Sequence, residues 1–172
     1  MANIILLGDG ENHEWYDWIS TEVVKRGHSF FLPELPPVKE GMNAWIESLK
    51  DYRKHFDESS VLIGHGAGRL IVLKILEEKL RDIKGAILIS GKTLREEFPN
   101  FQLEELDFKV IKEKSKNFFV YATEHDDDES VSESEEIAQA LEDELLIHEG
   151  EKYFKKQDKF EDLLIDIISL CD

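Results

Sequence analysis

A strand, a glycine-rich turn and a helix follow one another without a break between Ser60 and Leu76, and this unit constrains the fold most. The apolar run at 61–63 is typical of a buried parallel strand. The turn after it is Gly64-His65-Gly66-Ala67-Gly68. The next residues recur at helical spacing, with apolar side chains at Leu70, Leu73, Leu76 and Leu80 and polar ones at Arg69, Lys74, Glu77 and Glu78. The unit predicts a parallel sheet with helices packed against it.

The frame of this turn is that of the nucleophile elbow, G-x-S-x-G, in which a serine sits on a sharp strand-to-helix turn. Gly64 and Gly68 occupy the positions where the strand and helix backbones approach too closely for a β-carbon. The central position, which would carry the serine, is Gly66. Glycine there removes the backbone strain, about 1–3 kcal/mol, that a residue with a β-carbon bears in such a turn. The sequence therefore contains the frame of a catalytic turn without its nucleophile.

Strands and helices alternate along the whole chain. The expected strands are Asn3–Leu7, His28–Leu32, 61–63, Lys84–Ser90, Asn117–Thr123 and Glu144–His148. The expected helices are 15–24, Asn43–Phe56, the one after the elbow, Glu104–Lys114, Ser132–Leu141 and Lys159–Leu170. This order predicts an α/β fold, a doubly wound, mostly parallel sheet flanked by helices, in a single domain over residues 1–172. Ligands bind such sheets at the carboxyl ends of the strands.

The formal net charge of −17 argues against two classes of partner. Nucleic acids and anionic membranes would both be repelled by so acidic a chain, so neither is expected. The single cysteine, Cys171, cannot form an internal disulfide, and we find neither a signal peptide nor an apolar run long enough to span a membrane. We therefore expect a soluble, cytoplasmic protein.

The glycine-rich turn after the first strand, Gly8 to His13, raises the question of a dinucleotide cofactor. The fingerprint G-x-G-x-x-G requires a third glycine where this chain has His13. Asp9 and Glu11 would also face a pyrophosphate with like charge. We therefore expect no cofactor.

Several further motifs of this sequence match motifs of one known family at the same places along the chain. They are His13-Glu-Trp-Tyr-Asp-Trp (H-x-W-x-x-W), the prolines between Pro33 and Pro37, Trp45-Ile-Glu, Ile63-Gly-His-Gly-Ala-Gly and Ile89-Ser-Gly. In these motifs the sequence resembles the YdeN-type small α/β-hydrolases, the family of the human retinoblastoma-binding serine hydrolase, and the resemblance extends over nearly the whole chain. The resemblance implies a lidless α/β-hydrolase fold.

The catalytic triad of this family runs Ser, Asp, His in chain order. The resemblance places Gly66 at the serine position, Asp126 at the acid position, with Asp127 as the alternative if the loop shifts by one, and Tyr153 at the histidine position. Glycine carries no nucleophile, and tyrosine, with an ordinary pKa of about 10, is a poor base at neutral pH. The resemblance thus implies a serine-hydrolase-like pseudoenzyme that acts as a binding or regulatory module.

The oxyanion hole of such an enzyme consists of backbone N–H groups, which do not depend on the triad. Here they would come from Ala67 and from Asp9 or Gly10, at the start of the helix after the elbow. The side chains expected around this pocket are His13, Trp15 and His65. Such a pocket favours a small acyl or carbonyl ligand. Of the three aromatic residues Trp15, Tyr16 and Trp18, two are expected in the core.

One alternative is an active hydrolase or esterase with a rearranged or metal-assisted site. His13, His65 and His125 all lie on loops at the strand ends, as do Asp126 and Asp127, and such groups together could hold a zinc-like metal. We favour the simpler interpretation, in which His13 and His65 are family residues without a metal.

The stretch Glu124–Glu144 holds eleven carboxylates and no lysine or arginine. A run of this kind is usually a solvated loop and helix face. Its functional interpretation is a docking surface for a protein partner with a basic surface, or weak binding of divalent cations, and both possibilities stay open.

Overall fold

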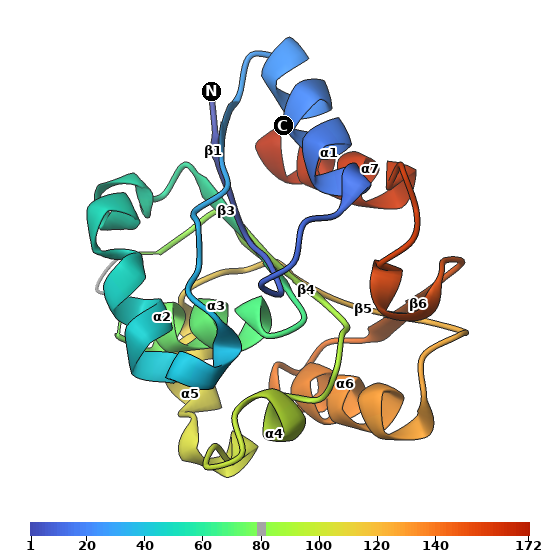
Figure 1. Ribbon diagram of the computed structural model, residues 1–172. Helices are drawn as coiled ribbons and strands as arrows, with labels where there is room; N and C mark the ends of the chain where they lie inside the picture. Colours follow the sequence, from blue (N-terminus) through green and yellow to red (C-terminus); the bar gives the residue numbers. More distant parts are fainter. Residues whose placement is uncertain (79–81) are drawn as a thin grey trace.

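The structure is a computed structural model and describes residues 1–78 and 82–172. Within these residues, six parallel strands form one sheet in the order β2-β1-β3-β4-β5-β6 (Figure 1). The strands are β1 (Asn3–Leu7), β2 (Ser29–Phe31), β3 (Ser60–His65), β4 (Gly85–Ile89), β5 (Phe118–Thr123) and β6 (Leu145–His148). The predicted doubly wound α/β fold is confirmed. The strand order reverses between β1 and β3, which is where open α/β sheets bind ligands.

Helices cover both faces of the sheet. One face carries α1 (Glu14–Lys25) and α7 (Glu161–Cys171), and the other carries α2 (Met42–Ser48), α3 (Gly68–Glu78), α5 (Phe108–Glu113) and α6 (Asp128–Ala140) (Figure 1). A separate apolar core fills each interface. Trp15 and Ile19 belong to the first core, and Trp45 and Leu70 belong to the second. Leu80, predicted to continue the apolar side of α3, lies outside the described residues. None of the helices in the described ranges is long and apolar enough to cross a membrane.

The predicted helix Asn43–Phe56 is wrong as a single element. Helix α2 ends at Ser48, and the chain continues as a 3₁₀ helix over Lys50–His55. The Ser48 hydroxyl donates to the Trp45 carbonyl at 2.6 Å, a local bond that competes with the helical pattern. Apolar spacing alone could not reveal this break.

Two other helix starts are set by capping aspartates. Asp107 accepts a hydrogen bond from the Val110 N–H and caps α5. The helix predicted from Glu104 therefore begins only at Phe108. The chain before it forms a short helix, α4 (Leu94–Glu97), and a 3₁₀ turn over Leu103–Glu105. Asp127 caps α6 in the same way, which starts that helix four residues before the predicted Ser132. The sheet and the order of the elements were thus predicted more accurately than the helix ends.

Candidate functional site

The elbow lies between β3 and α3, at the carboxyl edge of the sheet. Its outer glycines are needed for the reason that the sequence suggested. A β-carbon on Gly68 would lie 1.9 Å from the Leu7 carbonyl oxygen, and one on Gly64 would lie 2.7 Å from the Arg69 Cα. The central residue, Gly66, has φ +58°, the left-handed conformation that side chains rarely adopt. The local geometry is therefore that of a nucleophile elbow.

Two residues from neighbouring loops approach Gly66 closely. A β-carbon at this position would lie 2.8 Å from the Asp9 Cβ, which extends from the loop after β1. From the other side, Gly91 packs so closely that a β-carbon on it would lie 2.5 Å from the Gly66 Cα. The Gly66 N–H donates to the Ile89 carbonyl at 3.0 Å and ties the turn to β4. A side chain at the centre of the elbow would therefore require a shift of Asp9.

The Asp9 carboxylate is held by the loop that carries it. His13 Nε2 lies 2.9 Å from both carboxylate oxygens, and the Glu11 N–H donates to Oδ1 at 3.0 Å. Burial alone would raise the pKa of Asp9, but the bond from His13 and the nearby imidazoles outweigh it and lower the pKa to about 2. Asp9 is therefore a fixed carboxylate directly beside the nucleophile position.

His65 is completely buried behind the elbow. Its Nε2 lies 2.7 Å from the Tyr153 carbonyl, which can only accept, so Nε2 carries the proton. Burial lowers the pKa of His65 to about 4, so the ring is neutral and its Nδ1 accepts from the Tyr16 hydroxyl at 2.6 Å. Because Tyr16 is also buried, the pKa of its hydroxyl lies well above the usual value, and the phenol keeps its proton. Both nitrogens of His65 are thus engaged inside the protein.

The structure brings the acid and histidine positions of the expected triad together. Asp126 Oδ1 accepts from the Tyr153 N–H at 2.9 Å, while Oδ2 accepts from the Ser90 hydroxyl at 2.6 Å and the Thr123 N–H at 2.9 Å. The Tyr153 hydroxyl donates instead to Asp127. Burial and this contact raise the pKa of Tyr153 above its usual range. Asp126 and Asp127 both contact Tyr153, one through its backbone and one through its side chain.

Two backbone donors line a cavity of about 220 Å³ over the elbow. Among the described residues, the N–H groups of Ala67 and Gly10 have no hydrogen-bond partner, whereas the Asp9 N–H donates to the Tyr16 hydroxyl. Of the expected donors, Ala67 and Gly10 therefore have N–H groups open to the cavity in this conformation, whereas the Asp9 N–H is already used. The charged residues of the cavity are Asp9, Glu11, Lys92, Glu97 and Lys155.

Three predicted pocket residues lie beneath this cavity rather than in its lining. His13, Trp15 and His65 are 8%, 0% and 0% exposed, and the Trp15 Nε1 donates to the Phe154 carbonyl at 2.6 Å. Trp15 and Tyr16 are the two aromatic residues in the core, while Trp18 is half-buried.

The predicted constellation of histidines and carboxylates is only partly assembled. His13 and His65 stack edge to face at a centroid distance of 5.2 Å, but the carboxylate between them is Asp9. His125 is exposed and pairs with its neighbour Glu124 at 3.6 Å. Asp126 is used by Ser90 and Tyr153, as described above. The grouping with His125, Asp126 and Asp127 is therefore wrong.

Arg69, expected on the polar side of α3, is instead 1% exposed. Its Nε donates to the Gly66 carbonyl at 2.9 Å and its Nη2 to the Lys92 carbonyl at 2.9 Å. Glu133 of α6 lies 3.5 Å from the same Nη2 and accepts from the Leu94 N–H. Arg69 therefore joins the elbow to the loop after β4 and to α6. Helical spacing could not reveal this role, because the compensating carboxylate comes from a distant helix.

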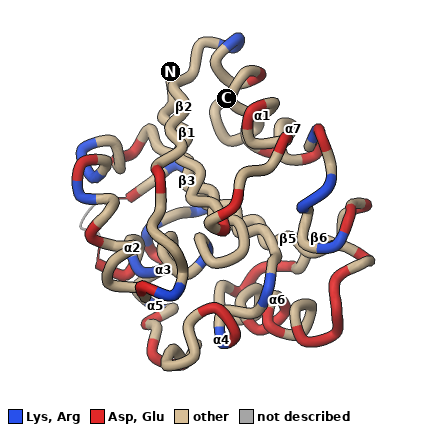
Figure 2. The backbone as a smooth tube through the Cα atoms, viewed as in Figure 1, with Lys and Arg blue, Asp and Glu red and all other residues tan. Residues whose placement is uncertain are grey.

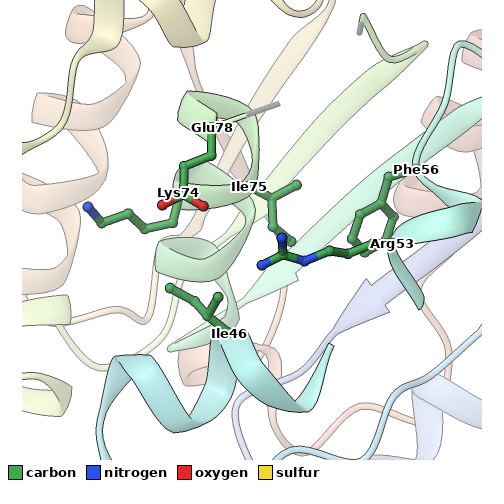
Figure 3. A pocket seen from close by; sticks show the side chains of 6 residues that line it. All are labelled: Ile46, Arg53, Phe56, Lys74, Ile75 and Glu78. Carbon is green, nitrogen blue, oxygen red and sulfur yellow. The ribbon is translucent and has the colours of Figure 1, made fainter. Parts of the chain in front are cut away.

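A second cavity, of about 130 Å³, lies between α2, the 3₁₀ helix and α3 (Figure 3). Ile46, Phe56 and Ile75 form its apolar part, and the charged residues Arg53, Lys74 and Glu78 complete its lining. It shares no lining residue with the cavity over the elbow.

The family model described as "Serine hydrolase" matches residues 6–165 of the chain. The YdeN protein of Bacillus subtilis is 24% identical over 163 residues, which cover 90% of this chain and 84% of that protein. Its crystal structure matches with a TM-score of 0.84 at 18% identity, covering 99% of this chain and 98% of that one. Tomato methylketone synthase I, in a structure with 2-tridecanone, matches with a TM-score of 0.67 at 12% identity, covering 98% and 97%.

Proposed function

This chain belongs to the serine hydrolase family, and we propose that within it the chain is a pseudoenzyme that acts as a binding or regulatory module. One observation carries the proposal. A β-carbon at Gly66 would lie 2.8 Å from the Asp9 Cβ, so a serine side chain does not fit there unless Asp9 moves. Without a nucleophile at that point, the acyl transfer of a serine hydrolase cannot begin.

The base that such a reaction needs is also missing at the corresponding position. The Tyr153 hydroxyl remains protonated and donates a hydrogen bond to Asp127, so it does not serve as a general base near neutral pH. Asp126 would orient a histidine in an active relative, but here it receives a backbone N–H of Tyr153. These contacts support a site that keeps the framework of the triad without its chemistry.

The ligand we propose for the pocket is an uncharged acyl or carbonyl group. The N–H groups of Ala67 and Gly10 are available donors for one oxygen, at the N-terminal side of α3. A free anion is disfavoured by Asp9, and Lys155 is already paired with Glu11 at 2.9 Å. Binding can be followed by amide NMR during titration with a short-chain ketone or amide. The largest shifts are expected at Ala67 and Gly10, and changes confined to other regions would contradict this ligand class.

The alternative, an active hydrolase or esterase with a rearranged or metal-assisted site, is separated from this proposal by one assay. Turnover of a short-chain p-nitrophenyl ester is measured with the unmodified protein before and after chelator treatment. We expect no rate above background in either case. A rate that disappears with the chelator would favour a metal-assisted enzyme, and a rate that survives it would refute the loss of hydrolysis.

A gain-of-function variant tests the structural reason directly. Gly66→Ser combined with Tyr153→His restores the side chains of the triad but leaves the Asp9 Cβ in place. We expect ester turnover only when Asp9→Gly is added to this pair. Equal activity of the double and triple variants would show that Asp9 does not close the site.

A protein partner with a basic surface is our proposal for the acidic face. Of the eleven carboxylates between Glu124 and Glu144, nine are exposed, while Asp126 and Glu133 are used within the protein. Figure 2 shows acidic residues along α6 and the loop that precedes it. Binding of a lysine-rich peptide should weaken as salt increases and should weaken further after charge reversal at Glu135 and Glu136. Binding that is insensitive to both changes would contradict this surface.

A further inference from the structure

Three potential metal ligands of two chemical types meet at the junction of β1 and β3. One carboxylate oxygen of Asp9 and one ring nitrogen each of His13 and His65 all lie within 4.8 Å of one another. Asp9 and His13 belong to the loop after β1, and His65 is the last residue of β3. Both histidines are buried, and the Asp9 side chain is 10% exposed. The group therefore lies inside the protein, with one side toward solvent.

The spacing of these atoms is close to that of a tetrahedral site. Bonds of about 2.0–2.1 Å to zinc place neighbouring ligand atoms about 3.3–3.4 Å apart. The distance from Asp9 Oδ2 is 2.9 Å to His13 Nε2 and 3.9 Å to His65 Nδ1. These two distances lie on either side of the ideal one, and the ligand nitrogens of His13 and His65 lie within 4.8 Å of each other.

Each histidine is oriented by a backbone carbonyl on the side away from Asp9. His13 Nδ1 lies 3.3 Å from the Lys155 carbonyl, and His65 Nε2 lies 2.7 Å from the Tyr153 carbonyl. Because both carbonyls accept, the opposite nitrogen of each ring is the one available for a metal. A carbonyl or carboxylate bound to the second ring nitrogen is the usual arrangement of metal-binding histidines. The two rings are thus held in the orientation that a metal site requires.

Two present contacts would change when an ion binds. His13 Nε2 now faces both oxygens of Asp9, a contact that requires a proton on this nitrogen, and the metal would replace that proton. The Tyr16 hydroxyl would give up its bond to His65 Nδ1 but keeps the Asp9 N–H as a partner at 3.3 Å. Because the Asp9 N–H donates to the Tyr16 oxygen, the Tyr16 hydroxyl would need a new acceptor for its own proton.

In place of the metal-free interpretation favoured from the sequence, we propose that Asp9, His13 and His65 bind one divalent transition-metal ion of the zinc class. Two imidazoles and one carboxylate suit zinc or cobalt, whereas calcium and magnesium prefer oxygen ligands in larger number. Three protein ligands leave a fourth position, and one of the three, Asp9, also lines the cavity over Gly66 and Ala67. The site is independent of the proposed loss of hydrolysis, because an ion can bind there with or without turnover.

Metal binding is tested without any activity assay. Protein freed of metal by chelator is titrated with Co²⁺ and with Zn²⁺, and the visible absorption of four-coordinate cobalt and the calorimetric stoichiometry are recorded. We expect one ion per chain. Asp9→Asn and His13→Gln should each weaken binding by more than about 100-fold, since even outer-shell partners contribute 10–100-fold. His125→Gln, which removes an exposed histidine beside the acidic run, should leave binding unchanged.

X-ray absorption of the unmodified, zinc-loaded protein gives a result that does not depend on how the variants fold. Scattering from two imidazoles and one or two oxygens is expected. An all-oxygen shell would mean that the acidic surface holds the ion and would overturn the proposal. The absence of a one-to-one complex, or equal binding by Asp9→Asn and the unmodified protein, would overturn it as well.

Discussion

The contact between Asp9 and Gly66 can be measured as a coupling free energy. Gly66→Ala places a β-carbon at φ +58°, which costs about 1–2 kcal/mol for a single left-handed residue. The same β-carbon meets the Asp9 Cβ at 2.8 Å, and overpacking of this kind costs about 1–3 kcal/mol. Reduced freedom of the unfolded chain offsets about 0.4–1 kcal/mol. We therefore expect Gly66→Ala to lower the free energy of unfolding by about 2–4 kcal/mol.

Two replacements of Asp9 separate the steric part from the electrostatic part. Asp9→Gly removes the β-carbon that makes the contact, so Gly66→Ala should cost only about 1 kcal/mol in that background. Asp9→Ala removes the carboxylate but keeps the β-carbon, so the full 2–4 kcal/mol should remain. The expected coupling energy is thus about 1–3 kcal/mol with Asp9→Gly and close to zero with Asp9→Ala.

Urea unfolding of the six proteins, with a constant m-value across the set, measures these differences. The reasoning fails if Gly66→Ala has the same effect in the Asp9→Gly and Asp9→Ala backgrounds. In that case backbone strain alone would disfavour a side chain at position 66. Restoring the nucleophile would in that case need no change at Asp9.

Two further predictions concern buried polar contacts and use the same urea assay. Glu133→Ala leaves Arg69 buried without its carboxylate and should cost about 3–5 kcal/mol, whereas Glu136→Ala on the same helix, in an exposed ion pair, should cost about 0.5 kcal/mol or less. Similar losses for the two variants would show that the buried pair is not important. Trp15→Phe removes a buried donor and should cost about 1–3 kcal/mol, against less than about 1 kcal/mol for the half-buried Trp18→Phe. A larger loss for Trp18→Phe than for Trp15→Phe would contradict the burial of Trp15 in the core.

The parts of the structure that could be predicted from the sequence are those set by local rules. A buried apolar run, two glycines at fixed spacing and a helical period sufficed to place β3, the elbow and α3, and the crowding at Gly64 and Gly68 follows from that geometry alone. The positive φ of Gly66 follows in the same way. Helix ends were less predictable, because a hydroxyl at Ser48 or a cap at Asp127 changes them without altering the apolar pattern.

The contacts that decide the chemistry come from residues far apart in the sequence. Arg69 has a polar position in the helical pattern and becomes buried only because α6 supplies Glu133. Asp9 and Gly66 could both be placed at the ends of neighbouring strands. Whether the Asp9 side chain reaches Gly66 depends on the path of the loop after β1, which contains two glycines. The spacing of residues along the sequence does not determine that path. The hydrogen bond between Asp9 and His13, four residues later in this loop, fixes that path.

One residue connects the two proposals made for the elbow. The Asp9 β-carbon excludes a side chain at Gly66, and the Asp9 carboxylate stands between His13 and His65. Replacing it with glycine should therefore open the nucleophile position and remove a metal ligand in a single step. Replacing it with alanine should remove the ligand and keep the position closed. Metal affinity and tolerance of a side chain at position 66 should therefore change together in Asp9→Gly, whereas in Asp9→Ala only the metal affinity should change.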